Sequence, residues 1–112
     1  MCTQEQLDNI TTEVVKIYQS VYGEDISDIL LYGSYARGDS KDDSDIDVVA
    51  IVKGTRLDLQ KRLRIVWELT VDIGLENDVI VSPMVIPYDE FETYKRILPY
   101  YRSIAEEGRR IG

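Results

Sequence analysis

Two short groups of residues in this chain have the types and the spacing of a site for phosphate and metal. Gly33 and Ser34 follow an apolar run, and a glycine-serine turn after a strand can direct backbone N–H groups at a phosphate. Ten residues separate Ser34 from Asp45, and Asp47 follows two positions later. Two carboxylates at i and i+2 of a strand point to the same side and can share a divalent cation. Together the two groups predict phosphoryl or nucleotidyl transfer.

A third carboxylate is expected from Asp78, which opens a later apolar run. If that run forms a strand beside the one that follows Asp47, the third carboxylate reaches the same site, and three carboxylates can hold two metal ions. Asp72 and Glu76 are its rivals, and the simpler interpretation of Asp78 is a residue that caps a turn. We therefore expect Asp45, Asp47 and Asp78 as catalytic and metal-binding residues.

Two cations lie between the glycine-serine pair and the aspartates. Arg37 and Lys41 could reach a triphosphate from this loop, although solvated loop cations are an equally good interpretation. The remaining acidic residues of the loop, Asp39, Asp42 and Asp43, are expected to face solvent. Gly33, Ser34, Arg37 and Lys41 are therefore the expected nucleotide-binding residues.

The pattern of apolar residues predicts the elements that must position this site. Long helices are indicated where apolar residues recur every three or four positions, over 3–22 and 56–75. Strands are indicated by short, β-branched runs, over 29–32, 46–52 and 78–86. Within 46–52 the alternation of a strand turns Ile46 toward the core and both neighbouring aspartates to the opposite side.

Shorter segments complete the expected order α-β-β-α-β-α. Helical turns are expected at 35–37, 88–91 and 94–107, and the tail 108–112 is expected to be disordered. Pro83 suggests an edge strand, a bulge or an early end of the strand, and Pro99 kinks or divides the last helix. Trp67 is expected in the core, and most tyrosines are expected to pack rather than to catalyse. Strands that alternate with helices predict an α/β (α+β) domain with helices on at least one face of its sheet.

Composition limits the classes of function that remain. The 112 residues fit one domain over 1–112, and a net charge of −8 argues against binding duplex nucleic acid alone, although it permits a metal-bound nucleotide. The chain has no histidine, which excludes a histidine base, a Ser-His-Asp triad and the usual zinc sites. No apolar stretch approaches the ~20 residues of a membrane helix, and no signal-peptide pattern is found. With its single cysteine, the chain is expected in the reducing cytoplasm.

The string Gly-Ser-Tyr-Ala-Arg-Gly-Asp at 33–39, followed by Asp-Ser-Asp-Ile-Asp at 43–47, resembles the signature of the minimal nucleotidyltransferases of the DNA polymerase beta superfamily. The likeness extends over about 29–86 and implies a mixed sheet and transfer of a nucleoside monophosphate from a nucleoside triphosphate, with ATP as the expected donor. It implies that Gly33 and Ser34 hold the triphosphate, that Asp45 and Asp47 bind one or two Mg²⁺, with Mn²⁺ as a substitute, and that Asp78 activates the acceptor hydroxyl.

The resemblance also implies a partner. Small members of this family are paired with helical HEPN proteins in toxin–antitoxin systems, where the nucleotidyltransferase acts as antitoxin and in some pairs attaches AMP to the toxin. Larger members carry an additional acceptor-binding domain, so here the acceptor would be held by a partner, by another copy of this chain or by the C-terminal helices. Two hypotheses remain open: an adenylyltransferase, or a binding module that neutralises its partner by occlusion. An antibiotic-modifying enzyme is disfavoured, because the chain has no second domain.

Overall fold

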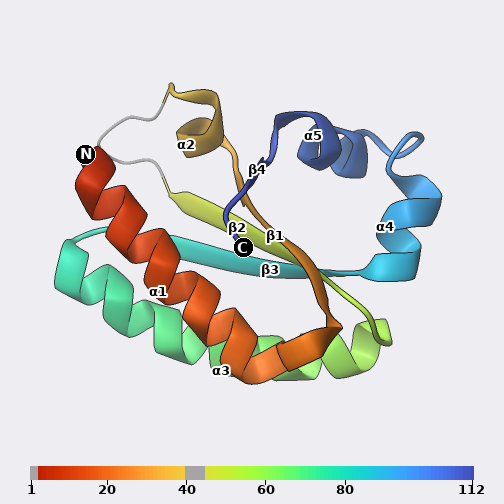
Figure 1. Cartoon of the computed structure of the whole chain (residues 1–112), viewed down its shortest axis with the longest axis horizontal. Coiled ribbons are helices and arrows are strands. Elements are labelled where there is room, and N and C mark those ends of the chain that lie inside the picture. Colours follow the sequence, from red (N-terminus) through yellow and green to blue (C-terminus); the bar gives the residue numbers. More distant parts are fainter. Residues whose placement is uncertain (1–2, 40–44) are drawn as a thin grey trace.

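The computed structural model describes residues 3–39 and 45–112 (Figure 1). Lys41, Asp42 and Asp43 therefore lie outside the described residues. The helices are α1 (Gln4–Tyr22), α2 (Ser34–Arg37), α3 (Arg56–Asn77), α4 (Tyr88–Tyr94) and α5 (Pro99–Glu107), with a 3-10 turn at Gly23–Asp25. The strands are β1 (Ile26–Tyr32), β2 (Ile46–Val52), β3 (Val81–Pro87) and β4 (Arg109–Arg110).

The four strands form one mixed sheet in the order β3-β2-β1-β4. β2 runs parallel to β3, and β1 is antiparallel to both β2 and β4. The predicted mixed sheet with covering helices is thus confirmed. Of the three alternatives for Pro83, the structure has the edge strand, where Pro83 needs no ladder hydrogen bond. Among the described residues, no helix is long and apolar enough to cross a membrane.

One face of the sheet is closed by the two long helices, α1 and α3 (Figure 1). Alternate residues of β2 point into this layer and are 0% exposed: Ile46, Val48, Ala50 and Val52. Both helices begin at a threonine whose hydroxyl accepts a backbone N–H of the first turn, Thr3 for α1 and Thr55 for α3. The closed face is therefore a rigid support for the strand that carries Asp47.

The opposite face is covered by α4 and α5. These short helices pack Phe91, Tyr101 and Ile104 over Val49 and Ile51, which are the outward-alternating residues of β2. Asp47 belongs to the same alternation as Val49, so it lies on this face, beyond the cover at the start of the strand. We call the α4/α5 side the open face and the α1/α3 side the closed face.

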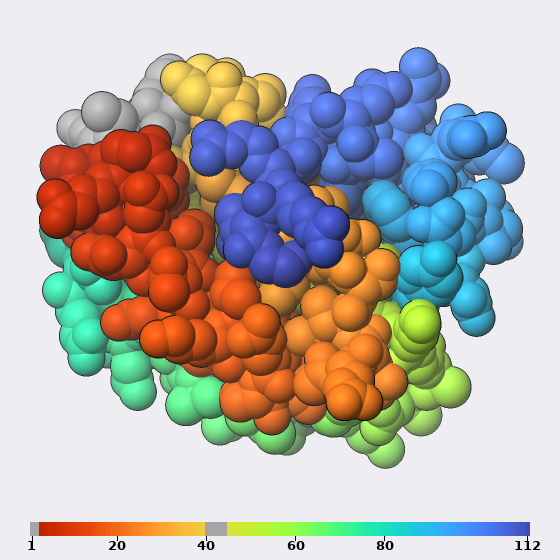
Figure 2. Space-filling view, in the orientation of Figure 1, coloured from red at the N-terminus to blue at the C-terminus, as the bar shows by residue number. Residues whose placement is uncertain are grey.

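The C-terminal tail was expected to be disordered, and that prediction was wrong. Arg109 and Arg110 pair with Leu31 and Leu30 as β4, and Ile111 continues the hydrogen bonding to Ile29. Figure 2 shows these last residues seated on the surface between α1 and β1. The tail is too short to show a period, so its strand depends on the free edge of β1.

Two further expectations need correction. The strand predicted from Asp78 begins only at Val81, because α3 continues to Asn77 and Asp78 ends it in the left-handed conformation with φ 54°. Trp67 was expected in the core but is 42% exposed. The buried face of α3 includes Leu63, Val66, Thr70 and Ile73, and Trp67 lies at the border of that face.

Candidate functional site

The predicted glycine-serine pair and Asp47 meet at the end of the sheet where β1 finishes and β2 begins. Tyr32, the last residue of β1, is paired with Asp47 of β2, and Asp47 is paired with Ser82 of β3. All three residues have intermediate exposure and lie side by side across the open face. The strand pairing therefore brings together residues that are up to 50 positions apart in the chain.

Gly33 lies directly against the Asp47 carboxylate. A Cβ atom added at Gly33 would be 2.6 Å from Oδ2 of Asp47, and Gly33 has φ 75° and ψ −152°, a conformation that side chains disfavour. Only glycine lets the turn pass this close to the carboxylate. Ser34 then begins the short helix α2, in which the N–H groups of Ala36 and Arg37 both donate to the Gly33 carbonyl at 3.1 Å. The structure thus brings the turn and Asp47 together, and phosphate binding by Gly33 and Ser34 stays a prediction.

Asp45 and Asp47 form a concentrated negative charge. Partial burial, together with repulsion from Asp45, raises the pKa of the Asp47 carboxyl, and Arg37 opposes that rise. Asp45 is exposed and Ile46 between them is fully buried, as the alternation of a strand requires. A bound cation would offset both effects, so the chemistry of the two carboxylates fits Mg²⁺, which takes one or two carboxylates plus substrate phosphates.

Arg37 lies at the end of α2, close enough to lower the pKa of Asp47. Its guanidinium forms ion pairs with Asp39 at 3.4 Å and with Glu107 of α5 at 3.5 Å. These neighbours raise the pKa of Arg37, first through its hydrogen bond to Asp39. Exposed ion pairs of this kind are weak, so Arg37 can exchange Asp39 for a triphosphate at little cost.

Asp78 does not join the first two aspartates in a three-ligand cluster. Among residues 3–39 and 45–112, no group of three or more His, Cys, Asp or Glu side chains is arranged to hold a metal ion. Asp78 is exposed at the end of α3 and precedes β3 by three residues, whereas Ser82 is the β3 residue paired with Asp47. Its rivals Asp72 and Glu76 are exposed on α3. The role of Asp78 stays a prediction.

Three residues beside Asp47 were not foreseen as parts of the site: Tyr32, Ser82 and Tyr100. Tyr100 of α5 packs edge-to-face on Tyr32 at 6.2 Å between ring centroids. Burial raises the pKa of Tyr100, and the nearby Tyr32 and Asp47 add to the rise. The positions of these residues depend on the register between strands and on the docking of α5, and no local sequence pattern predicts either. The position of Tyr32 directly before Gly33 was the one available signal.

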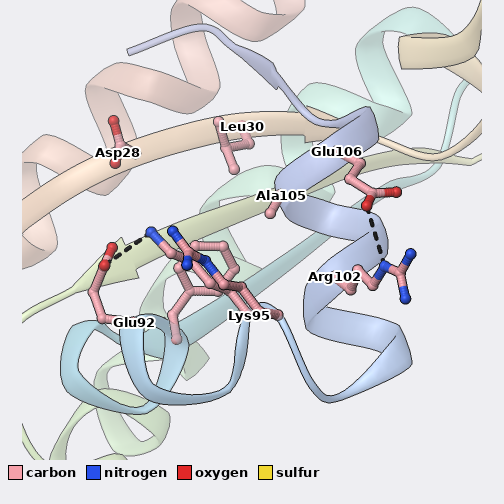
Figure 3. A pocket seen from close by; sticks show the side chains of 9 residues that line it. Asp28, Leu30, Glu92, Lys95, Arg102, Ala105 and Glu106 are labelled. Atoms are coloured by element: carbon pink, nitrogen blue, oxygen red, sulfur yellow. Dashed lines mark hydrogen bonds and ion pairs between the residues drawn. The ribbon is translucent and has the colours of Figure 1, made fainter.

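A separate cavity of about 450 Å³ lies between α4, α5 and the outer part of β1 (Figure 3). Its charged side chains largely pair among themselves: Lys95 with Glu92 at 2.8 Å and Arg102 with Glu106 at 3.1 Å. It is bordered by Asp28 and Leu30, on the part of β1 away from Gly33. This cavity is thus distinct from the pair of aspartates.

The comparison with protein families assigns the chain. The model of the nucleotidyltransferase domain matches residues 8–111, which include the whole site. This chain belongs to the nucleotidyltransferase domain family. The family resemblance stated from the sequence is thereby confirmed, and the chain is a nucleotidyltransferase.

Three relatives from Methanocaldococcus jannaschii carry the name "Putative protein adenylyltransferase". MJ1305 is 35% identical over 71% of this chain, which spans 58% of that relative's length. MJ0604 is 33% identical over 87% of this chain and 89% of its own length, and MJ0141 is 28% identical over 76% and 91%. The similarity therefore covers most of the length of MJ0604 and MJ0141.

Two solved structures share the fold. A toxin–antitoxin structure with AMP-PNP has a TM-score of 0.58 and 19% identity, over 89% of this chain and 70% of that one. A mutant of the MntA-HpeT toxin–antitoxin has a TM-score of 0.58 and 17% identity over the same shares. At these identities the likeness shows the nucleotidyltransferase fold alone.

Proposed function

We propose that this nucleotidyltransferase transfers AMP from Mg²⁺-ATP to a hydroxyl group of a partner protein. The observation that carries the proposal is the contact between the Gly33 turn and the Asp47 carboxylate, which places a phosphate-binding turn beside a metal ligand. The names of the relatives support AMP as the transferred group and protein as the acceptor. The toxin–antitoxin neighbours support a partner protein, for which a HEPN toxin is our candidate.

Each residue of the site has a proposed role. Gly33 and Ser34 hold the triphosphate through the backbone of their turn, and Arg37 neutralises part of its charge, as Lys41 would from the adjoining loop. Asp45 and Asp47 hold the metal, which when bound neutralises charge on the triphosphate and on the attacking and leaving oxygens. Asp78 is the proposed group that orients the acceptor hydroxyl or accepts its proton.

The transfer is an in-line displacement at the α-phosphorus. The acceptor oxygen forms a bond to this phosphorus, the bond to the bridging oxygen breaks, and pyrophosphate leaves while the acceptor loses its proton. The protein contributes mainly by positioning these groups and by stabilising charge. The pKa of Asp47 is raised first by burial and then by repulsion from Asp45, and a bound cation would favour the ionised form of this carboxylate.

The test measures which phosphate of ATP becomes attached to protein. Incubation of the purified chain with polypeptides of its host should yield protein-bound label from α-labelled ATP and none from γ-labelled ATP, because AMP is retained and pyrophosphate leaves. Label from the γ-position would indicate phosphoryl transfer and contradict the proposal. GTP, CTP and UTP labelled at the α-position identify whether adenine is required.

Variants of the acidic residues assign the roles. Asp45→Asn should abolish Mg²⁺-dependent ATP binding measured by calorimetry, and Asp78→Asn should retain binding but lose transfer. Glu13→Gln, an exposed change on α1, is the control and should change neither property. Full transfer by Asp45→Asn would overturn the metal assignment, and full transfer by Asp78→Asn would leave the acceptor without its proposed base. Neutralisation of a partner by an Asp45→Asn/Asp47→Asn protein would favour occlusion instead.

A further inference from the structure

An apolar strip runs along the border between α3 and the sheet. Trp67, Val71 and Leu75 follow at steps of four on α3, so they share one side of the helix. They are 42%, 50% and 77% exposed, and Ile80, just before β3, is 62% exposed. Large side chains scattered singly need no explanation, but a contiguous strip marks an interaction surface. We call these four residues the α3 strip.

The α3 strip lines a groove along the free edge of β3. A cavity of about 180 Å³ contains all four residues together with Val79 and Val81. A second cavity of about 300 Å³ continues from Trp67 past Pro83 and Val85 to Arg56. Because the two cavities share Trp67, the groove follows α3 over most of its length.

The free edge of β3 is built against pairing with another strand. The carbonyl of Val85 faces α3, where Nε2 of Gln60 donates to it at 3.5 Å. By the two-residue period of a strand, Pro83 and Pro87 face the same edge and offer no N–H group. Prolines at an edge block strand addition, so the groove suits a segment that satisfies its own backbone, such as a helix.

Charge around the groove selects the chemistry of the occupant. The last part of α3 carries four exposed acidic side chains and no basic one: Glu68, Asp72, Glu76 and Asp78. Carboxylates at a helix C-terminus oppose the helix dipole, so their placement there does not serve the stability of α3. They would attract lysine and arginine, and they would repel the same surface of a second copy of this chain.

The groove also leads to the catalytic end of the sheet. The carbonyl of Ile80 accepts the backbone N–H of Ile46 at 2.8 Å, and Ile46 lies between Asp45 and Asp47. A helix seated on the α3 strip would therefore end beside the two carboxylates. We infer that this groove docks an amphipathic helix, apolar on one side and flanked by Lys and Arg, from the protein that accepts AMP. The inference rests on the proposed function and names the partner's chemistry.

The single tryptophan of the chain reports on this docking directly. The probe is a synthetic helical peptide with leucine at steps of three and four and lysine on its flanks, compared with the same peptide carrying glutamate for lysine. The lysine peptide should bind saturably and shift the Trp67 emission to the blue, and added salt should weaken it. The glutamate peptide should bind at least tenfold more weakly. Equal binding of the two peptides, or no shift of Trp67, would overturn the inference.

Matched variants localise the binding. Val71→Lys/Leu75→Lys places two charges in the groove and should weaken the lysine peptide at least tenfold. Leu57→Lys/Ile97→Lys is the control, because these side chains are 68% and 71% exposed and lie outside both groove cavities. Equal loss in the control, or a dimer of the wild-type chain that Val71→Lys/Leu75→Lys dissociates, would overturn the inference.

Failure of this inference can be separated from failure of the proposed function. Val71→Lys/Leu75→Lys should bind Mg²⁺-ATP like the wild type, because no groove residue touches the nucleotide in our assignment. Asp45→Asn should bind the lysine peptide within about twofold of the wild type while it loses ATP binding. If the groove variant keeps AMP transfer to host proteins at the wild-type rate, the groove is not the acceptor dock, although the enzyme assignment stands.

Discussion

The closed and open faces of the sheet are made by the same strands but have opposite properties. On the closed face, α1 and α3 bury every alternate residue of β2 completely. On the open face, α4 and α5 cover Val49 and Ile51 but leave Asp47, Tyr32 and Ser82 partly exposed. The neighbouring residues Asp47 and Val48 thus have different surroundings, because the Asp47 side chain is partly exposed and the Val48 side chain is fully buried.

This difference follows from the two-residue period of a strand. A carboxylate in the middle of a buried strand would be costly, but at the start of the strand on the open face it remains hydrated and still has a rigid backbone. On the open face, the residues of β2 covered by α4 and α5 begin at Val49, two positions after Asp47. The Asp47 carboxylate therefore has a fixed backbone but lies next to uncovered surface. Substitutions on the two faces should therefore separate activity from stability.

The largest separation of activity from stability is expected between substitutions at Asp47 and at its neighbour Val48. Asp47→Asn should lower the rate of nucleotidyl transfer by about two to three orders of magnitude, the usual loss when one group that stabilises a transition state is removed. It should not lower stability, because it removes the repulsion from Asp45. Rates of AMP transfer and urea unfolding measure the two effects.

Val48→Ala is the matched change on the closed face. It removes two methyl groups from a side chain that is 0% exposed, which should cost about 2 kcal/mol of folding free energy. At a temperature where the variant is folded, its transfer rate should stay within a few-fold of the wild type. A large loss of stability in Asp47→Asn, or of activity in folded Val48→Ala, would break the division between the faces.

The next largest effect is expected at Gly33. Gly33→Ala places a methyl group 2.6 Å from the Asp47 carboxylate in a backbone conformation that alanine disfavours, so we expect a loss of about tenfold to a hundredfold in ATP affinity. Gly38→Ala is the control, because Gly38 also has positive φ, at 83°, but nothing lies within 4 Å of an added Cβ. It should cost about 1 kcal/mol of stability and leave ATP binding in place.

Calorimetric titration of Mg²⁺-ATP compares the two variants. Equal weakening by both would mean that backbone strain, rather than the contact with Asp47, determines nucleotide affinity. Full affinity in Gly33→Ala would remove the turn from the site.

Much of this arrangement could be predicted from the sequence. The β-branched run at 46–52 and the period of α1 are strong local signals, and the glycine-serine and aspartate groups indicated the family. The site residues that escaped prediction, Tyr32, Ser82 and Tyr100, depend on register between strands and on the docking of α5. Such placements are set by tertiary packing and leave no periodic trace in the chain.

The errors have similar causes. Asp78 and the two residues after it were assigned to a strand because the run is apolar, but α3 continues up to Asp78, which takes the left-handed conformation at its end. Trp67 was assigned to the core because large aromatic residues are usually buried there, yet it borders a groove that a partner could fill. An apolar side chain that serves an interface has the same sequence signal as one that serves the core.

A smaller effect, confined to stability, is expected on the closed face at Tyr18. Its buried hydroxyl donates its one proton to the carbonyl of Met84 at 2.8 Å, with the carbonyl of Val48 at 3.2 Å as the second acceptor within reach, and it accepts the Met84 N–H at 3.0 Å. Burial raises the pKa of this phenol above its usual range, so it stays protonated. Tyr18→Phe should cost about 1–3 kcal/mol, because buried backbone groups lose their partner.

The transfer rate of folded Tyr18→Phe should remain that of the wild type, measured well below its unfolding midpoint. Glu24→Gln, an exposed change in the turn after α1, is the control for stability and should be neutral. Reduced transfer in the folded variant would show that the closed face also tunes the site.

The smallest effect concerns pH and connects the open face to stability. The pKa of Asp47 is raised in the folded protein, so the folded state binds this proton more tightly than the unfolded chain does. The contribution of Asp47 to folding is therefore unfavourable at neutral pH and improves as pH falls through the folded pKa toward the unfolded value of about 3.9. Without metal, Asp47→Asn should be more stable than the wild type at pH 7, and this gap should close as the solution is acidified.

Thermal unfolding in the presence of a chelator measures the difference in stability between the wild type and Asp47→Asn at each pH. Contributions that the two proteins share, such as those of distant carboxylates, cancel in this difference. Mg²⁺ with a non-hydrolysable ATP analogue should reverse the order at pH 7, because the bound cation favours the ionised carboxylate that the asparagine variant lacks. A gap that widens on acidification would mean that Asp47 is stabilised in its charged form by its neighbours. In that case the protein itself would balance the charge of Asp47 without a ligand. The open and closed faces would then differ only in how exposed their residues are.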